Sequence, residues 1–125
     1  VLGAAGLLVG RRAACHWLSR DMLAEFGAIP DPARIVIDGK HISGGGVTAG
    51  IDFAFAVVAA LVGEAKAKEI QLLLEYAPEP PFRGGTPETA DAQTLADVRA
   101  MTQGMIEPRR AAVRRAAGKL GLPRG

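Results

Sequence analysis

A chain of 125 residues is long enough for one domain with a hydrophobic core, and we treat residues 1–125 as one domain. A content of 49% hydrophobic and 22% charged residues is ordinary for a globular protein and excludes a disordered tail. Aromatic residues make up only 5%, whereas alanine, glycine and leucine abound, which favours an α/β protein over a β-sandwich. The net charge of +2 indicates no class of partner. The single cysteine excludes an intramolecular disulfide, and we expect a cytoplasmic protein.

The first part of the chain predicts a helix, a strand and a second helix. Residues 1–9 are apolar and rich in alanine and leucine. They begin with neither a start methionine nor a capping residue, so we expect the chain to begin inside a longer domain. Residues 13–16 are strand-like, and Ser19 is a candidate cap for a helix that reaches Phe26 and ends at Gly27.

The middle of the chain predicts a hairpin followed by an apolar helix. Two prolines make residues 29–32 a stiff connector. Residues 34–38 predict a strand, Asp38-Gly39 a tight turn, and residues 41–43 the returning strand. Residues 47–62 predict a helix that is apolar on nearly every side, so we expect it to be buried on several faces.

The last part predicts two helical regions joined by an arm. Residues 64–76 are amphipathic, with Ala65, Ile70 and Leu73 among the candidate inward residues. The prolines and glycines of residues 77–87 predict an extended arm. Helix resumes near Thr89, and Pro108 is placed to open a new helix.

Basic residues gather at the C-terminal end, as they do in some segments that bind nucleic acid or anionic lipid. Apolar residues there recur at helical spacing, so we interpret the basic residues as the solvated side of an amphipathic helix and expect no nucleic-acid partner. The apolar residues are Val113, Ala116, Ala117 and Leu120, and the basic ones are Arg109, Arg110, Arg114, Arg115, Lys119 and Arg124. Residues 53–63 are apolar but shorter than the ~18 residues that span a bilayer, so we expect no membrane partner.

Cys15 and His16 are adjacent, but we do not expect them to form a catalytic pair. Neighbours on a strand point to opposite faces, so the thiol and the imidazole could not bond to one another, and we expect only one of them to face a pocket. His16 and His41 lack the spacing of metal ligands, and we expect no metal.

The run GGGVTA at residues 44–49 fits the G-x-G-x-x-A pattern of dinucleotide-binding turns. The match is weak because the preceding strand belongs to a hairpin and the following helix leads to another helix. A P-loop is excluded because no Lys-Ser/Thr follows the glycines. Two interpretations remain open: backbone N–H groups at the helix start face a ligand, or the glycines merely let the helix approach the sheet. Gly46 and Thr48 are the candidate pocket residues.

Four segments together resemble a known family. They are VLGAAGLL at residues 1–8, ACHW at 14–17, GGGVTAGIDFA at 44–54, and QLLLEYAPEPPF at 71–82 followed by GTP. In order and spacing they resemble the ThiJ/PfpI superfamily, which has the class I glutamine amidotransferase-like fold, and within it the isonitrile hydratases. The resemblance implies the C-terminal part of a flavodoxin-like α/β three-layer sandwich.

The resemblance also implies a chemistry. In this family a cysteine nucleophile occupies a strand-to-helix elbow before the LGAAGLL helix, which places the nucleophile and its acidic partner upstream of Val1 and implies that Cys15 is not the nucleophile. His16 matches a family histidine beside the elbow and is a supporting catalytic candidate, although Ala14 replaces the usual threonine. The intact relative is implied to hydrate isonitriles to N-substituted formamides, as a homodimer acting on a small-molecule substrate without a cofactor.

Two rival interpretations remain. The sensor domain of AraC-type transcription regulators shares this fold, but those regulators continue into helix-turn-helix units, and nothing after Leu120 resembles them. The other is an inactive truncated member of the family. We expect this chain by itself to be inactive.

Overall fold

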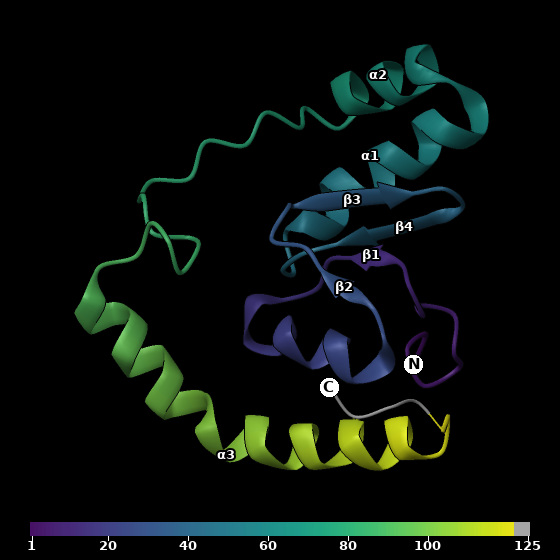
Figure 1. Cartoon of the computed structure of the whole chain (residues 1–125). Helices are drawn as coiled ribbons and strands as arrows, with labels where there is room; N and C mark the ends of the chain where they lie inside the picture. Colours follow the sequence, from purple (N-terminus) through teal and green to yellow (C-terminus); the bar gives the residue numbers. More distant parts are fainter. Residues whose placement is uncertain (122–125) are drawn as a thin grey trace.

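The computed structural model describes residues 1–121 and shows a mixed α/β arrangement (Figure 1). Two small sheets lie at its centre: β1 and β2 form a parallel pair, and β3 and β4 form an antiparallel pair. In chain order the elements are β1 (Arg12–Ala13), the 3-10 helices η1 (Trp17–Ser19) and η2 (Asp21–Phe26), β2 (Ile29–Pro30), β3 (Ile35–Asp38), β4 (His41–Gly44), α1 (Ala49–Val62), α2 (Glu64–Leu73) and α3 (Ala92–Gly118).

Residues 1–10 form a series of turns, so the predicted helix is wrong. The amide of Ala5 donates to the carbonyls of Val1 and Leu2, but Gly6 and Gly10 have φ angles of 75° and 69°, which interrupt a right-handed helix. Leu8 nevertheless packs into a small buried cluster with Ala13 and Ala28, so this segment covers the parallel strand pair.

The strand predicted over residues 13–16 is found as the shorter β1, and its parallel partner β2 was not predicted. β1 ends at Ala13, and three residues later the side chain of His16 caps η1. The predicted connector contains β2, and the amide of Ile29 donates to the carbonyl of Arg11 at 2.8 Å. The predicted second helix is present as η1 and η2, and Gly27, in the left-handed conformation at φ 69°, ends it as expected.

The predicted hairpin is confirmed. β3 pairs with β4 in antiparallel register, from Ile35 opposite Gly44 to Asp38 opposite His41, around a turn in which Gly39 has a φ angle of 61°. Val36 is 1% exposed, and it is the largest fully buried side chain of the described residues. β3 therefore contributes to the interior of the protein through Val36, and β4 leads into the segment before α1.

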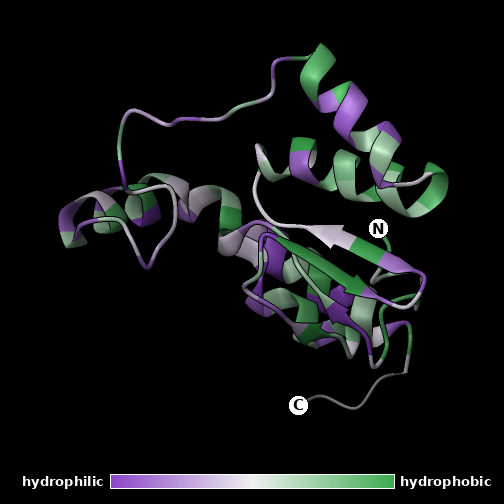
Figure 2. Ribbon diagram, turned by 90° about the horizontal axis from the view of Figure 1, so that it is seen from above, coloured by the Kyte–Doolittle hydropathy of each residue, from purple (hydrophilic) through white to green (hydrophobic). Residues whose placement is uncertain are grey.

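The burial expected of α1 and α2 is not found in this structure. Within α1 only Ala49 is buried, and α2 ends at Leu73, with Ala67 as its buried residue. Leu73, expected to point inward, is 82% exposed. Figure 2 shows hydrophobic residues along these two helices. Other large side chains there are also exposed, among them Leu61, Val62, Leu72 and Leu74.

Residues 77–87 contain no helix or strand, which confirms the predicted arm. The arm leads to α3, a single 27-residue helix that contains Pro108, so no new helix opens there. Proline removes one backbone donor and crowds the carbonyl four residues earlier, and Figure 1 shows that α3 bends along its length.

The arginines of α3 do more than face solvent, which corrects the interpretation made from spacing. Arg109 donates to the Ser19 hydroxyl at 2.9 Å, and Arg110 pairs with Asp21 at 2.7 Å. Arg114 pairs with Glu25 at 3.3 Å. Ala117 is buried as expected, and Arg124 lies outside the described residues. Hence ion pairs and a hydrogen bond from its arginines hold α3 against η1 and η2.

Across residues 1–121, no helix combines the length and the apolar character needed to cross a membrane.

Candidate functional site

The candidate site is a pocket of about 300 Å³ formed by four separate segments. Residues 15–17 and 20 come from the segment between β1 and η2 that contains η1, residues 32 and 34 precede β3, residues 45–48 precede α1, and residues 85–87 come from the arm. The three predicted site residues, His16, Gly46 and Thr48, all line it. The structure therefore brings together side chains that are far apart in the sequence.

His16 is held in a defined orientation. Its Nδ1 accepts a hydrogen bond from the backbone N–H of Leu18 at 3.3 Å, which caps η1, and its ring stacks on Trp17 with centroids 5.9 Å apart. In a neutral imidazole whose Nδ1 is an acceptor, the proton resides on Nε2. His16 can therefore act as a hydrogen-bond donor through Nε2.

The glycines before α1 serve two different purposes. At Gly44 an added Cβ would lie 3.3 Å from Cβ of Phe53, so this glycine lets α1 approach the hairpin closely. At Gly46 an added Cβ would lie 3.6 Å from Cδ2 of His16, so this glycine borders the pocket. Close packing against α1 thus accounts for Gly44, and Gly46 lies at the pocket wall.

Cys15 lines the same pocket as His16, which corrects the expectation that only one of them would face it. The alternation argument fails because neither residue belongs to a strand. The thiol is partly buried and donates to the carbonyl of His16 at 3.5 Å. Burial raises the pKa of the Cys15 thiol from its ordinary value, and the charge of Arg20 opposes this shift, so the environment disfavours the thiolate. The described geometry gives it no activating base.

A cluster of Arg34, Asp52 and Tyr76 supports one wall of the pocket. Asp52, in the first turn of α1, accepts from the Tyr76 hydroxyl at 2.5 Å and from Nε of Arg34, and Arg34 also reaches the Thr48 hydroxyl at 3.4 Å. The bonds from Tyr76 and Arg34 lower the pKa of Asp52, and the Asp52 carboxylate raises the pKa of Tyr76. Sequence reasoning missed this cluster because its members come from three distant segments.

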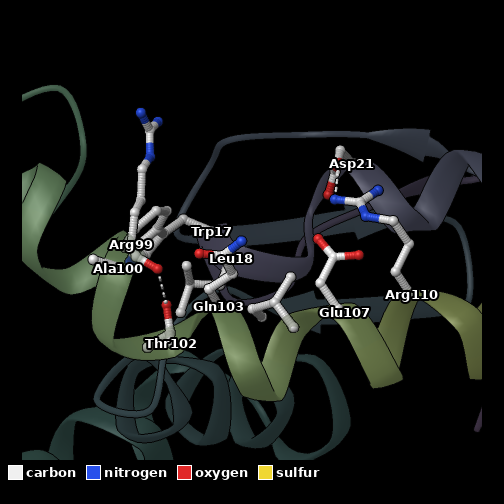
Figure 3. Close-up of a pocket in the computed structure, with 10 residues that line it drawn as sticks. Trp17, Leu18, Asp21, Arg99, Ala100, Thr102, Gln103, Glu107 and Arg110 are labelled. Atoms are coloured by element: carbon white, nitrogen blue, oxygen red, sulfur yellow. Dashed lines mark hydrogen bonds and ion pairs between the residues drawn. The ribbon is translucent and has the colours of Figure 1, made fainter.

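A second, more open pocket of about 540 Å³ lies between η1–η2 and α3 (Figure 3). Three of its polar side chains have partners within the protein. Asp21 pairs with Arg110, and the Thr102 hydroxyl donates within α3, to the carbonyls of Val98 at 2.7 Å and Arg99 at 3.3 Å. The Arg99 side chain extends away from the Asp21–Arg110 pair (Figure 3).

Within the part of the chain that the structure describes, no three His, Cys, Asp or Glu side chains are grouped so that they could hold a metal ion. That part of the chain includes both His16 and His41.

Comparison with known proteins identifies the family. No protein-family profile matches the chain. An isonitrile hydratase from Pseudomonas putida is 48% identical over 122 residues, which is 98% of this chain and 54% of that protein. The crystal structure of a ThiJ/PfpI family protein from Pseudomonas syringae superposes with a TM-score of 0.84 at 44% identity, covering 94% of this chain and 47% of the other. The chain belongs to the ThiJ/PfpI superfamily.

A second solved structure supports the same assignment. A cysteine-to-alanine mutant of a DJ-1 superfamily protein from Salmonella typhimurium superposes with a TM-score of 0.55 at 35% identity, over 62% of this chain and 42% of that one. The predicted superfamily and α/β fold class are thereby confirmed. The chain spans about half the length of the relatives it matches.

Proposed function

We propose that this chain forms part of the substrate pocket of an isonitrile hydratase-like enzyme. The observation that carries the proposal is the 48% identity to the Pseudomonas putida isonitrile hydratase across 98% of the chain. The pocket supports it, because His16, Gly46 and Thr48, which the sequence indicates as site residues, lie together in one cavity.

In the proposed reaction, a thiolate adds to the terminal carbon of R–N≡C while an acid supplies a proton, giving a thioimidate. Water then adds to that carbon, with one of its protons going to the nitrogen and the other returning to the acid, and the carbon–sulfur bond breaks, so that the thiolate leaves with release of R–NH–CHO. Cys15 is a poor candidate for the thiolate because burial raises its pKa. We assign the nucleophile and the acid to residues outside this 125-residue sequence.

His16 is assigned a supporting role in this reaction. Its Nδ1 is engaged by Leu18, so Nε2–H is the group that can donate to the substrate nitrogen or to the attacking water. Gly46 and Thr48 border the same space, where a side chain at position 46 would approach the imidazole ring. The residues of this chain therefore orient the substrate and do not attack it.

The test is a fusion of this chain to the part of the Pseudomonas putida relative that it does not match. We expect the fusion to hydrate a simple uncharged isonitrile and this chain alone to be inactive. In the fusion, His16→Ala should lower kcat about 10²-fold if the imidazole assists proton transfer. Cys15→Ala should change mainly stability and serves as the matched control. An inactive Cys15→Ala fusion beside a fully active His16→Ala fusion would reverse these assignments.

A further inference from the structure

The candidate pocket contains two guanidinium groups and no carboxylate. Arg20 and Arg34 both line it, and no Asp or Glu of residues 1–121 is among its lining residues. The second pocket is different, because Asp21 and Glu107 line it together with its arginines. Arg34 is paired with Asp52 and Arg20 lies 3.9 Å from Glu88, but neither carboxylate lines the pocket, so the charged groups that face its interior are guanidinium donors.

Both arginines keep donors that the protein does not use. Nε of Arg20 is buried and lacks a hydrogen-bond partner within the described structure. Its nearest acidic contact is Glu88, whose oxygen lies 3.9 Å from Nη1 and whose side chain is 65% exposed. Arg34 uses Nε for Asp52 and Nη2 for Thr48, at a long 3.4 Å, and its Nη1 takes part in neither bond. Because Nε of Arg20 is covered by protein atoms, a ligand oxygen would have to reach this side chain at its terminal Nη atoms.

The remaining walls suit a flat apolar body. Trp17, Pro32, Val47 and Pro87 contribute apolar surface, and a volume of about 300 Å³ is at the small end for ligand sites. Guanidinium groups recognise carboxylates through paired, charge-assisted hydrogen bonds.

We propose that this pocket binds the carboxylate of a small aromatic or similarly flat organic acid, with Arg20 and Arg34 as its partners. Binding itself does not require the isonitrile reaction. If the proposed function is also correct, the substrate is an isonitrile that bears a carboxylate; only this consequence rests on the proposed function. Failure of the fusion to hydrate an uncharged isonitrile would refute the function and leave this binding site in place.

Trp17 provides a natural probe, because it is the only tryptophan of the chain and lines the pocket. The 125-residue chain is titrated with benzoate and, separately, with benzamide, its uncharged counterpart, at constant ionic strength. We expect a saturable change of fluorescence with benzoate and at least about tenfold weaker binding of benzamide. Equal binding of the two compounds would overturn the proposal.

Because Trp17 also borders the second pocket, matched variants locate the ligand. Arg20→Gln and Arg34→Gln should each weaken benzoate binding about tenfold or more. Arg99→Gln, which alters a residue of the second pocket and not of the first, should leave it unchanged. Weakened binding in Arg99→Gln together with unchanged binding in Arg34→Gln would place the ligand in the other pocket and refute the proposal.

A second readout needs no variant. Cys15 lines the proposed site, so benzoate should slow its alkylation by iodoacetamide, and benzamide should not. Protection by benzoate alone would support the proposal even if Trp17 fluorescence did not respond. If neither fluorescence nor alkylation responds to benzoate, the pocket is not a carboxylate site.

Discussion

Replacing Gly3 by alanine tests how tightly residues 1–10 pack against η2. A Cβ added at Gly3 would lie 2.4 Å from Cδ2, 2.6 Å from Cγ and 3.0 Å from Cε2 of Phe26, whereas carbon atoms in contact are normally ~3.5–4.0 Å apart. The Phe26 ring or the N-terminal segment must therefore move by about 1 Å. Phe26 is only 8% exposed, so the ring has little room to do so.

Overpacking of this kind costs about 1–3 kcal/mol. For a chain of this size, a loss of about 2 kcal/mol lowers Tm by roughly 6–10 °C, measured by circular dichroism at low protein concentration. Gly104→Ala is the matched control, because an added Cβ there meets nothing within 4 Å inside α3, and it should stabilise by about 0.5–1 kcal/mol.

The smaller side chain in Phe26→Leu should relieve much of the loss caused by Gly3→Ala. An unchanged Tm in Gly3→Ala would refute the packing argument. So would a loss of Tm from Gly3→Ala that is the same with and without the Phe26→Leu substitution.

Three further predictions concern stability and surface. Val36→Ala should lower the free energy of unfolding by about 2 kcal/mol, from two lost methyl groups and a residual cavity, and urea denaturation would measure it. Hydrogen bonds lower the pKa of Asp52 in the folded protein. The Asp52 carboxylate therefore stabilises the fold fully above about pH 4, its ordinary pKa, and this stabilisation is lost as the pH falls through the lowered pKa of the folded state. Asp52→Asn should thus lower Tm at neutral pH, and the difference from wild type should vanish in acid; a constant difference would contradict this. The exposed Leu72 and Leu73 should bind a hydrophobic dye, and replacing both by glutamine should reduce its fluorescence, whereas an unchanged signal would place the dye elsewhere.

Elements fixed by local chemistry could be predicted from the sequence. The Asp38-Gly39 turn and the left-handed Gly27 depend on neighbouring residues, and both are found as expected. Residues 77–87 are irregular for the same reason, since their prolines act locally.

What depends on distant partners could not be predicted. An apolar pattern indicates that α1 has surface to bury but does not identify what covers it. Pro108 was expected to divide the last helix, yet the helix continues through it and bends. The bonds of Asp52 to Arg34 and Tyr76 join residues 18 and 24 positions away, and no spacing rule connects them. The homodimer stays a prediction that size-exclusion chromatography of the intact protein would test.

The arm connects ligand binding in the pocket to the position of α3. Gly85, Thr86 and Pro87 form one wall, and the same segment leads into α3, whose arginines hold η1 and η2. A ligand that contacts both Thr86 and η1 touches the segment that leads into α3 and the helix to which α3 is bound. Ligand affinity and the docking of α3 are then reciprocally linked: the ratio of the ligand's affinities for the docked and undocked states equals the factor by which the bound ligand shifts α3 toward the docked state.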